Sequence, residues 1–172
     1  MAVSRALSKA LKPGDFPRLI LESGRALVDE AGTLISTVVA TKRLADGTRA
    51  YVVDAGVNLL FTANWYKFTI ELDREVGGVN EHSIIYGPLC MNIDVVDEGV
   101  PLPPLSRGTR LVISPVGAYN HTQSLQFIEY RPASVLIGMN GEVDVIREAE
   151  DLSDIMGRER VPARLRKTQE SA

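Results

Sequence analysis

Short runs of β-branched and other apolar residues recur from residue 33 onward, and turn-forming residues separate them about every ten positions. This spacing is typical of a β-sandwich or a Greek-key β-barrel. We expect strands over residues 34–41, 51–54, 67–72, 83–86, 110–114, 124–129, 134–137 and 141–147. The Asp46-Gly47 pair predicts a hairpin between the first two strands. Pro101, Pro103 and Pro104 predict an extended loop, and residues 148–156 a final helix.

The first 32 residues follow a different pattern. Apolar residues at helical spacing predict a helix over residues 3–11. Residues 18–21 are typical of a buried strand, residues 22–25 of a turn, and residues 26–31 of a short helix that stops at Gly32. A lone parallel strand lacks the neighbours that such a strand needs. We therefore expect residues 1–32 to be a poorly anchored βα remnant of a larger fold, residues 33–157 to be the mainly β domain, and residues 158–172 to be a disordered basic tail.

Charge and cysteine content exclude several functional classes. The formal net charge is −3, which gives no general attraction to nucleic acid or to an acidic membrane surface. No apolar run reaches the ~20 residues that a spanning helix needs. A single cysteine cannot form an internal disulfide, so we expect a reducing, cytoplasmic setting. One cysteine and two scattered histidines do not form a metal-ligand spacing, so no metal site is predicted.

The single cysteine, Cys90, lies between a Gly87-Pro88 break and the acid Asp94. An isolated cysteine is often a small buried hydrophobic residue. A thiol on a loop of a rigid β scaffold can instead carry function. Both interpretations of Cys90 are open from the residues alone.

A second polar cluster comprises Glu22, Ser23, Gly24 and Arg25. Small residues at a helix start let backbone N–H groups approach an anion, and arginine adds a forked cation. Such a turn suits a phosphate-bearing cofactor, with Glu22 available to a protonated ring nitrogen. An exposed turn with an ion pair explains the same residues. Tyr119 has a similar pair of interpretations: a tyrosine packed at the end of a sheet, or a phenol that donates to a phosphate oxygen.

Five motifs follow one another along the chain, and together they carry a resemblance. They are Leu21-Glu22-Ser23-Gly24-Arg25, Ala31-Gly32-Thr33-Leu34, Val53-Asp54-Ala55-Gly56-Val57-Asn58, Tyr86-Gly87-Pro88-Leu89-Cys90 with Asp94, and Gly117-Ala118-Tyr119 with Arg131-Pro132 and Val135-Leu136-Ile137. Their types and order resemble the C-terminal part of the pyridoxal-phosphate-dependent decarboxylases of the ornithine, diaminopimelate and arginine group, the fold-type III enzymes. Ser23 replaces the usual proline of the first motif.

The resemblance implies a fold and a set of residue roles. The β domain would be the C-terminal barrel of these decarboxylases and of alanine racemase, and residues 18–31 would be the last strand and helix of a (β/α)₈ barrel. Glu22 would pair with the pyridine nitrogen of pyridoxal phosphate. Ser23, Gly24, Arg25 and Tyr119 would contact the phosphate or, for Arg25, the substrate. Cys90 would come from the partner subunit of a head-to-tail homodimer and return a proton after CO₂ leaves.

The implied substrate contacts are Arg25, Tyr66, Met91 and Asp94. Diaminopimelate enzymes usually carry a glutamate after the cysteine and an arginine after the Asp-Ala-Gly turn, and here Met91 and Thr62 stand in those places. This departure argues against meso-diaminopimelate and for another amino acid or amino-acid derivative.

The family's Schiff-base lysine and its glycine-rich phosphate loop belong to the barrel, and neither Lys9 nor Lys12 has the matching context. The expected function is therefore the C-terminal domain or split half of an amino-acid decarboxylase. It would bind pyridoxal phosphate only together with the lysine-bearing barrel domain and be inactive alone. The alternative is a non-catalytic interaction protein that binds a decarboxylase-like partner.

Overall fold

The computed structural model describes residues 5, 6, 8, 9, 11, 12, 14 and 20–165. Of the helix predicted over 3–11, residues 5, 6, 8 and 9 are helical and Leu11 is not. Residues 3, 4, 7 and 10 lie outside the described part. Of the strand predicted over 18–21, Ile20 and Leu21 are not in a strand and are 69% and 62% exposed, while residues 18 and 19 lie outside. The strand prediction is wrong for Ile20 and Leu21, because no described strand lies beside them to pair with.

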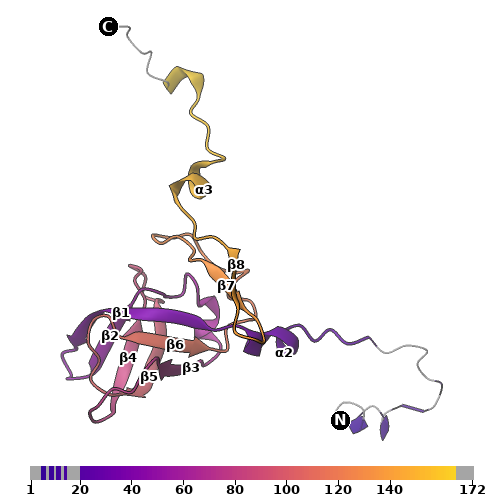
Figure 1. Cartoon of the computed structure of the whole chain (residues 1–172), viewed down its shortest axis with the longest axis horizontal. Coiled ribbons are helices and arrows are strands. Elements are labelled where there is room, and N and C mark those ends of the chain that lie inside the picture. Colours follow the sequence, from indigo (N-terminus) through magenta and orange to yellow (C-terminus); the bar gives the residue numbers. More distant parts are fainter. Residues whose placement is uncertain (1–4, 7, 10, 13, 15–19, 166–172) are drawn as a thin grey trace.

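Six strands form one sheet that curls into a nearly closed barrel (Figure 1). They are β1 (Leu34–Arg43), β2 (Arg49–Val53), β3 (Thr69–Leu72), β4 (Glu81–Tyr86), β5 (Val95–Leu102) and β6 (Arg110–Ser114). Their order is β3-β6-β1-β2-β4-β5, and each neighbouring pair is antiparallel except β2 and β4. The predicted mainly β barrel is confirmed.

Alternate residues of the strands fill the barrel interior, as a half-buried sheet requires. Val38, Val53, Ile85, Leu111 and Ile113 are fully buried there. A buried tyrosine on β2 closes one end: the Tyr51 hydroxyl donates to the Pro103 carbonyl oxygen at 2.9 Å and accepts from the Leu105 N–H at 3.0 Å. The prolines near residue 103 are thereby tied to the core.

Two segments differ from their predicted structure. Strand β5 runs through Pro101, which was predicted as loop; β5 is an edge strand that pairs only with β4, and an edge position tolerates proline. Residues 124–129, predicted as a strand, are irregular. Ile128 has a positive φ of 71°, which no extended strand permits, and the Leu125 N–H donates to the Asn58 carbonyl oxygen at 2.8 Å instead of to a strand.

Helical elements and a hairpin complete the described part. A short helical stretch precedes the barrel, α2 (Arg25–Val28) with η1 (Asp29–Ala31), and confirms the helix predicted over 26–31. Within the barrel domain, η2 (Phe61–Asn64) links β2 and β3. After β6 come β7 (Ser134–Ile137), β8 (Val143–Arg147), α3 (Leu152–Met156) and η3 (Ala163–Leu165). The final helix starts later than predicted, because Asp151 forms a capping box with Asp154.

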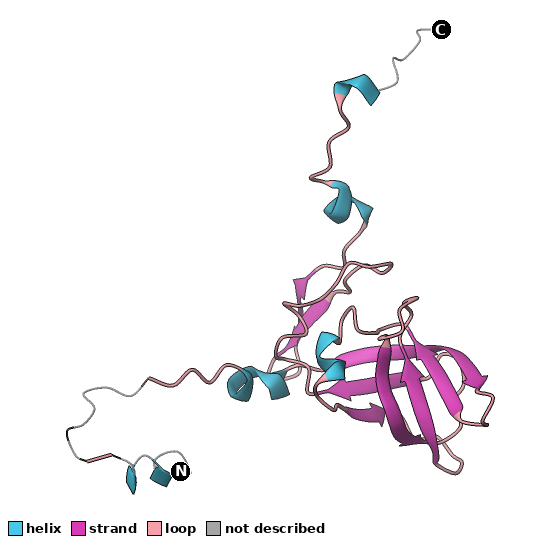
Figure 2. Cartoon of the chain, turned by 180° about the vertical axis from the view of Figure 1, so that it is seen from behind, coloured by secondary structure: helices cyan, strands magenta, loops and turns pink. Residues whose placement is uncertain are grey.

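The segment from β7 to η3 projects away from the barrel, which both views make plain (Figures 1 and 2). Among the described strands, β7 and β8 pair only with each other. Leu136, Ile137, Val143 and Ile146 are each more than half exposed. A lone hairpin is marginally stable in water, so this arm needs a covering surface. The tail predicted over 158–172 is described only to residue 165, and its boundary stays a prediction.

Candidate functional site

The Asp94 carboxylate joins two turns that are about 30 residues apart in sequence. One oxygen accepts the Val57 N–H at 2.8 Å, and the other accepts the Leu89 N–H at 2.6 Å. Asp94 is 2% exposed. A Cβ atom on Gly56 or Gly87 would overlap this carboxylate, so both turns require glycine for close approach. The acid is therefore the contact between the Asp-Ala-Gly turn and the Gly-Pro turn.

Cys90 lies on the outside of the turn that Asp94 holds. Its side chain is exposed and free, so the interpretation as a small buried hydrophobic residue is wrong. The next residue, Met91, is half-buried, and its carbonyl oxygen accepts the Asp94 N–H at 3.0 Å. Both Asp94 oxygens already bind backbone N–H groups, which favours a role in holding the cysteine loop. Its predicted substrate contact stays a prediction.

A second pair of glycines brings the first helical segment against the end of β6. A Cβ atom on Gly32 would overlap the Gly117 backbone, and one on Gly117 would overlap the Val28 carbonyl oxygen. The Gly117 N–H donates to the Asp29 carbonyl oxygen at 2.9 Å, and the Val116 N–H donates to the Gly32 carbonyl oxygen at 2.9 Å. The Ala-Gly and Gly-Ala-Tyr motifs are therefore one contact, which places α2 beside the turn that bears Tyr119.

Arg25, a predicted site residue, has two defined side-chain contacts. Its Nε donates to Asp29 Oδ2 at 2.5 Å, one helical turn away. Its guanidinium carbon lies 3.8 Å from the centre of the Tyr66 ring, a cation–π contact. The hydrogen bond to Asp29 raises the pKa of Arg25, so the group carries its positive charge at every working pH. Two predicted site residues from separate segments, Arg25 and Tyr66, are thereby brought together.

Tyr119 is 47% exposed and has a positive φ of 66°, which is unusual for a residue with a side chain. Its neighbours on both sides are bonded. The Ala118 N–H donates to Asp29 Oδ1 at 3.3 Å. Asn120 is 4% exposed, and its Oδ1 accepts the Thr62 hydroxyl at 2.9 Å and the Thr62 N–H at 3.2 Å. The turn therefore presents Tyr119 outward between two anchored residues.

The structure thus groups the predicted residues into two sets. Arg25 contacts Tyr66, and Asp29 links Arg25 to the turn that bears Tyr119. Cys90, Met91 and Asp94 share the other loop. Glu22, Ser23 and Gly24 are exposed and directly precede α2. Two connecting residues, Asp29 and Asn120, were not predicted, and Thr62 was named only as the replacement of an arginine. Only Asp29 had a sequence signal, its position four residues after Arg25.

Glu150 ties the irregular 124–131 segment to the chain before α3. It accepts Arg131 Nη1 at 2.8 Å and the Arg131 N–H at 3.1 Å, while Arg131 Nε donates to the Ser124 hydroxyl at 2.7 Å. Burial alone would raise the pKa of Glu150, but the hydrogen bonds from Gln126 and Arg131 outweigh it and lower this pKa. The Arg-Pro motif therefore has a structural part in holding the segment that follows Tyr119.

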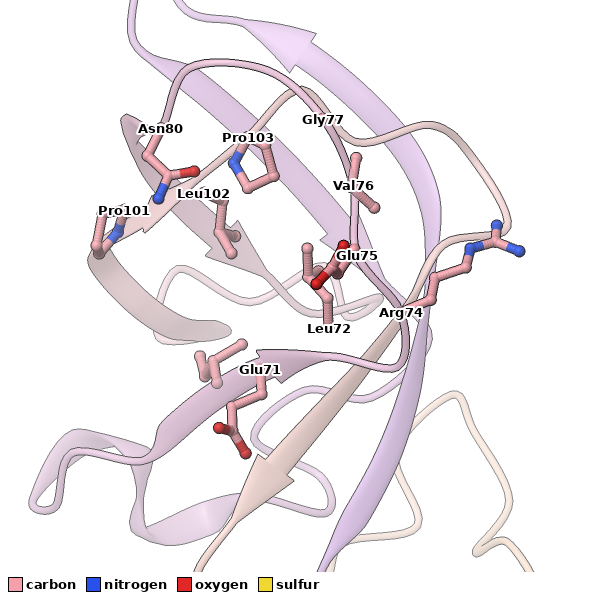
Figure 3. Close-up of a pocket in the computed structure, with 11 residues that line it drawn as sticks. Glu71, Leu72, Arg74, Glu75, Val76, Gly77, Asn80, Pro101, Leu102 and Pro103 are labelled. Atoms are coloured by element: carbon pink, nitrogen blue, oxygen red, sulfur yellow. The ribbon is translucent and has the colours of Figure 1, made fainter.

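A hollow of about 580 Å³ lies elsewhere, between β3, the 74–80 loop and the end of β5 (Figure 3). It shares no residue with either predicted set. Figure 3 shows the Arg74 side chain pointing away from it. Across the described residues, no three His, Cys, Asp or Glu side chains gather to hold a metal ion. No helix in that same part of the chain is long and apolar enough to cross a membrane.

Comparison with known proteins gives consistent matches. Residues 26–117 match the family described as "Pyridoxal-dependent decarboxylase, C-terminal sheet domain". A diaminopimelate decarboxylase of Methanothermobacter thermautotrophicus is 34% identical over 156 residues, which are 88% of this chain and 36% of that enzyme. A crystal structure of diaminopimelate decarboxylase from M. jannaschii superposes on 95% of this chain and 38% of that one, with a TM-score of 0.83 and 32% identity.

The Helicobacter pylori diaminopimelate decarboxylase, crystallised with L-lysine, covers 91% of this chain at a TM-score of 0.80 and 27% identity. This chain in turn covers 38% of that enzyme. It therefore spans little more than a third of the length of the relatives that it matches.

Proposed function

The chain belongs to the pyridoxal-dependent decarboxylase family, whose C-terminal sheet domain it contains, and we propose that it forms one half of an amino-acid decarboxylase site. The other half is the lysine-bearing barrel domain that the family resemblance implies. The observation that carries the proposal is the group of Arg25, Tyr66 and the Tyr119 turn, which Asp29 joins. A cation linked through Asp29 to a turn that bears an exposed phenol suits a phosphate-bearing ligand.

Three observations support the fit of the residues present to pyridoxal phosphate. Arg25 keeps its charge, and Tyr119 is exposed on an anchored turn. Gly24 has an ordinary negative φ of −77°, and a Cβ atom on it would meet nothing within 4 Å. Nothing among the described residues therefore requires glycine at this position. The open space at the Gly24 backbone, next to the cation Arg25, suits the close approach of an anion from outside the chain.

Each residue then has a part in binding. Arg25, Tyr119 and the backbone at Ser23 and Gly24 would hold the phosphate, and Glu22 would pair with the ring nitrogen. When bound, pyridoxal phosphate supplies an electron sink for the cleavage of the carboxylate. Tyr66 fixes the guanidinium plane of Arg25 by stacking.

Cys90 has the chemistry of a proton donor. Its thiol is exposed on a loop that the buried Asp94 holds in place. A thiol can hold and deliver a proton near neutral pH. In the proposed reaction Cys90 Sγ delivers its proton to the substrate carbon from which CO₂ has departed. The site it serves is that of the partner subunit in a homodimer.

The proposed substrate is an amino acid. The residues expected to contact the end of its side chain differ from those of the diaminopimelate enzymes. Thr62 stands where the resemblance expects an arginine, and it is buried with its hydroxyl bonded to Asn120. Met91 replaces an acid on the cysteine loop. The curated relatives are diaminopimelate decarboxylases, and three of the similar solved structures hold L-lysine. We expect a lower preference for the second carboxylate of diaminopimelate than those enzymes have.

The experiment is to mix the chain with a barrel domain of a relative and pyridoxal phosphate. A stable complex with the visible absorbance of bound cofactor supports the proposal, and Arg25→Met should weaken that binding. A complex that binds the cofactor and releases no CO₂ from any amino acid favours the non-catalytic alternative. Absence of any complex contradicts both.

A further inference from the structure

Asp29 contacts both parts of the proposed phosphate site, which are Arg25 and the turn that bears Tyr119. One carboxylate oxygen accepts Arg25 Nε, and the other accepts the Ala118 N–H next to Tyr119. Its backbone carbonyl oxygen accepts the Gly117 N–H. The side chain is 13% exposed, against 39% for Arg25, so it lies between the guanidinium and the turn. Its position suits a connecting residue more than a ligand contact.

Further contacts lead from Arg25 back to Asp29 and form a closed ring of interactions. Arg25 stacks on Tyr66, and the Tyr66 N–H donates to the Thr62 carbonyl oxygen at 2.9 Å. The Thr62 hydroxyl and N–H donate to Asn120, the residue after Tyr119. The turn then returns through Ala118 to Asp29. Three chain segments that are far apart in sequence therefore hold one another.

We propose that Asp29 is a positioning residue that makes Arg25 and the Tyr119 turn one preformed unit, so that a phosphate meets both without reorganisation. The link to phosphate rests on the proposed function, while the coupling of Arg25 to the Tyr119 turn belongs to this chain alone. Preformed donors bind an anion more tightly than donors that must first be ordered.

The first test uses Asp29→Asn in the whole chain. Arg25 and Ala118 donate to different oxygens of Asp29, and an asparagine replaces one of these oxygens with an NH₂ group, which would face a donor. NMR should show that Arg25 side-chain protons lose the ring-current shift of Tyr66. Hydrogen exchange at the Ala118 N–H should rise on the order of tenfold. Loss of neither signal, or of only one, would overturn the coupling.

The matched control is Asp73→Asn. Asp73 Oδ2 also accepts an arginine Nε, that of Arg110, at 2.9 Å, but at the β3–β6 pair. This variant should leave both signals at Arg25 and Ala118 unchanged. A change there in Asp73→Asn would mean that general loosening, and no specific link, explains the Asp29 result.

The second test measures cofactor binding in the complex with the barrel domain. Asp29→Asn should raise the dissociation constant for pyridoxal phosphate about tenfold, at the low end of the cost of losing an orienting partner at metal sites. Wild-type affinity in the variant overturns the positioning role and leaves the proposed function standing. If the wild-type complex itself binds no cofactor, the proposed function fails. The NMR experiment still decides whether Asp29 couples Arg25 to the Tyr119 turn.

Discussion

Replacing Asp94 with alanine should destabilise the chain far more than the loss of a surface charge. The carboxylate accepts two buried N–H groups, from Val57 and Leu89. Each buried donor left without a partner costs about 1–3 kcal/mol. The two glycine turns pack directly on this side chain, so water has little room to replace it. We expect a loss of about 3–5 kcal/mol in the free energy of unfolding, a large share of the roughly 5–15 kcal/mol of a domain.

Urea unfolding followed by far-UV circular dichroism measures this loss. Asp94→Asn keeps one acceptor oxygen and should lose about half as much as Asp94→Ala. Asp46→Ala is the matched control, because the Asp46 carboxylate also accepts a backbone N–H, from Thr48, in an exposed turn that water can reach. It should cost much less. If Asp94→Ala unfolds within about 1 kcal/mol of the wild type, the carboxylate is not the joint between the two turns, and the reasoning is refuted.

Three further predictions use other parts of the chain. Gly24→Ala should change the stability of the chain by less than about 1 kcal/mol and weaken pyridoxal phosphate binding in the complex. Gly117→Ala should destabilise the chain by more than about 2 kcal/mol, because its Cβ would overlap the Val28 carbonyl oxygen. Thermal unfolding compares the two variants, and equal melting temperatures would contradict this difference. The folded-state pKa of Glu150 lies below its usual value of 4.5, so its contribution to stability is present above that value and is lost as pH falls through the lower folded pKa. Hydrogen exchange at the Arg131 N–H should accelerate in that acid range beyond its intrinsic pH dependence. In Glu150→Gln it should not. The β7–β8 backbone should exchange fast in the chain alone and slowly in the complex with a barrel domain, and unchanged rates would show that the arm is not covered there.

The barrel class could be predicted from sequence because apolar alternation and turn residues act locally. The errors occur where tertiary context decides. Strand β5 contains Asp97, Glu98 and Pro101, which resemble a loop, yet an edge strand needs hydrogen bonds on one side only. Residues 124–129 have the composition of a strand, but side-chain and backbone bonds to Asn58, Arg131 and Glu150 hold them in an irregular path.

The site illustrates the same limit. The motifs predicted a set of candidate site residues, but spacing alone could not separate contacts within the fold from contacts with a ligand. Gly56 and Gly87 are glycines because of Asp94, and Gly32 and Gly117 because they touch each other. Gly24 has no such internal reason among the residues that the structure describes. Asn120 carries no sequence signal, because its partner Thr62 is brought to it only by the closed barrel.

The most direct test of the proposal is the rate of CO₂ release from amino acids by the chain mixed with a lysine-bearing barrel domain and pyridoxal phosphate. We predict release with the wild-type chain and a rate at least about 100-fold lower with Cys90→Ala, which should bind the cofactor as the wild type does, since general acid catalysis contributes about 10²–10⁴-fold. Release at the level of the barrel domain alone, or an unchanged rate with Cys90→Ala, would contradict it.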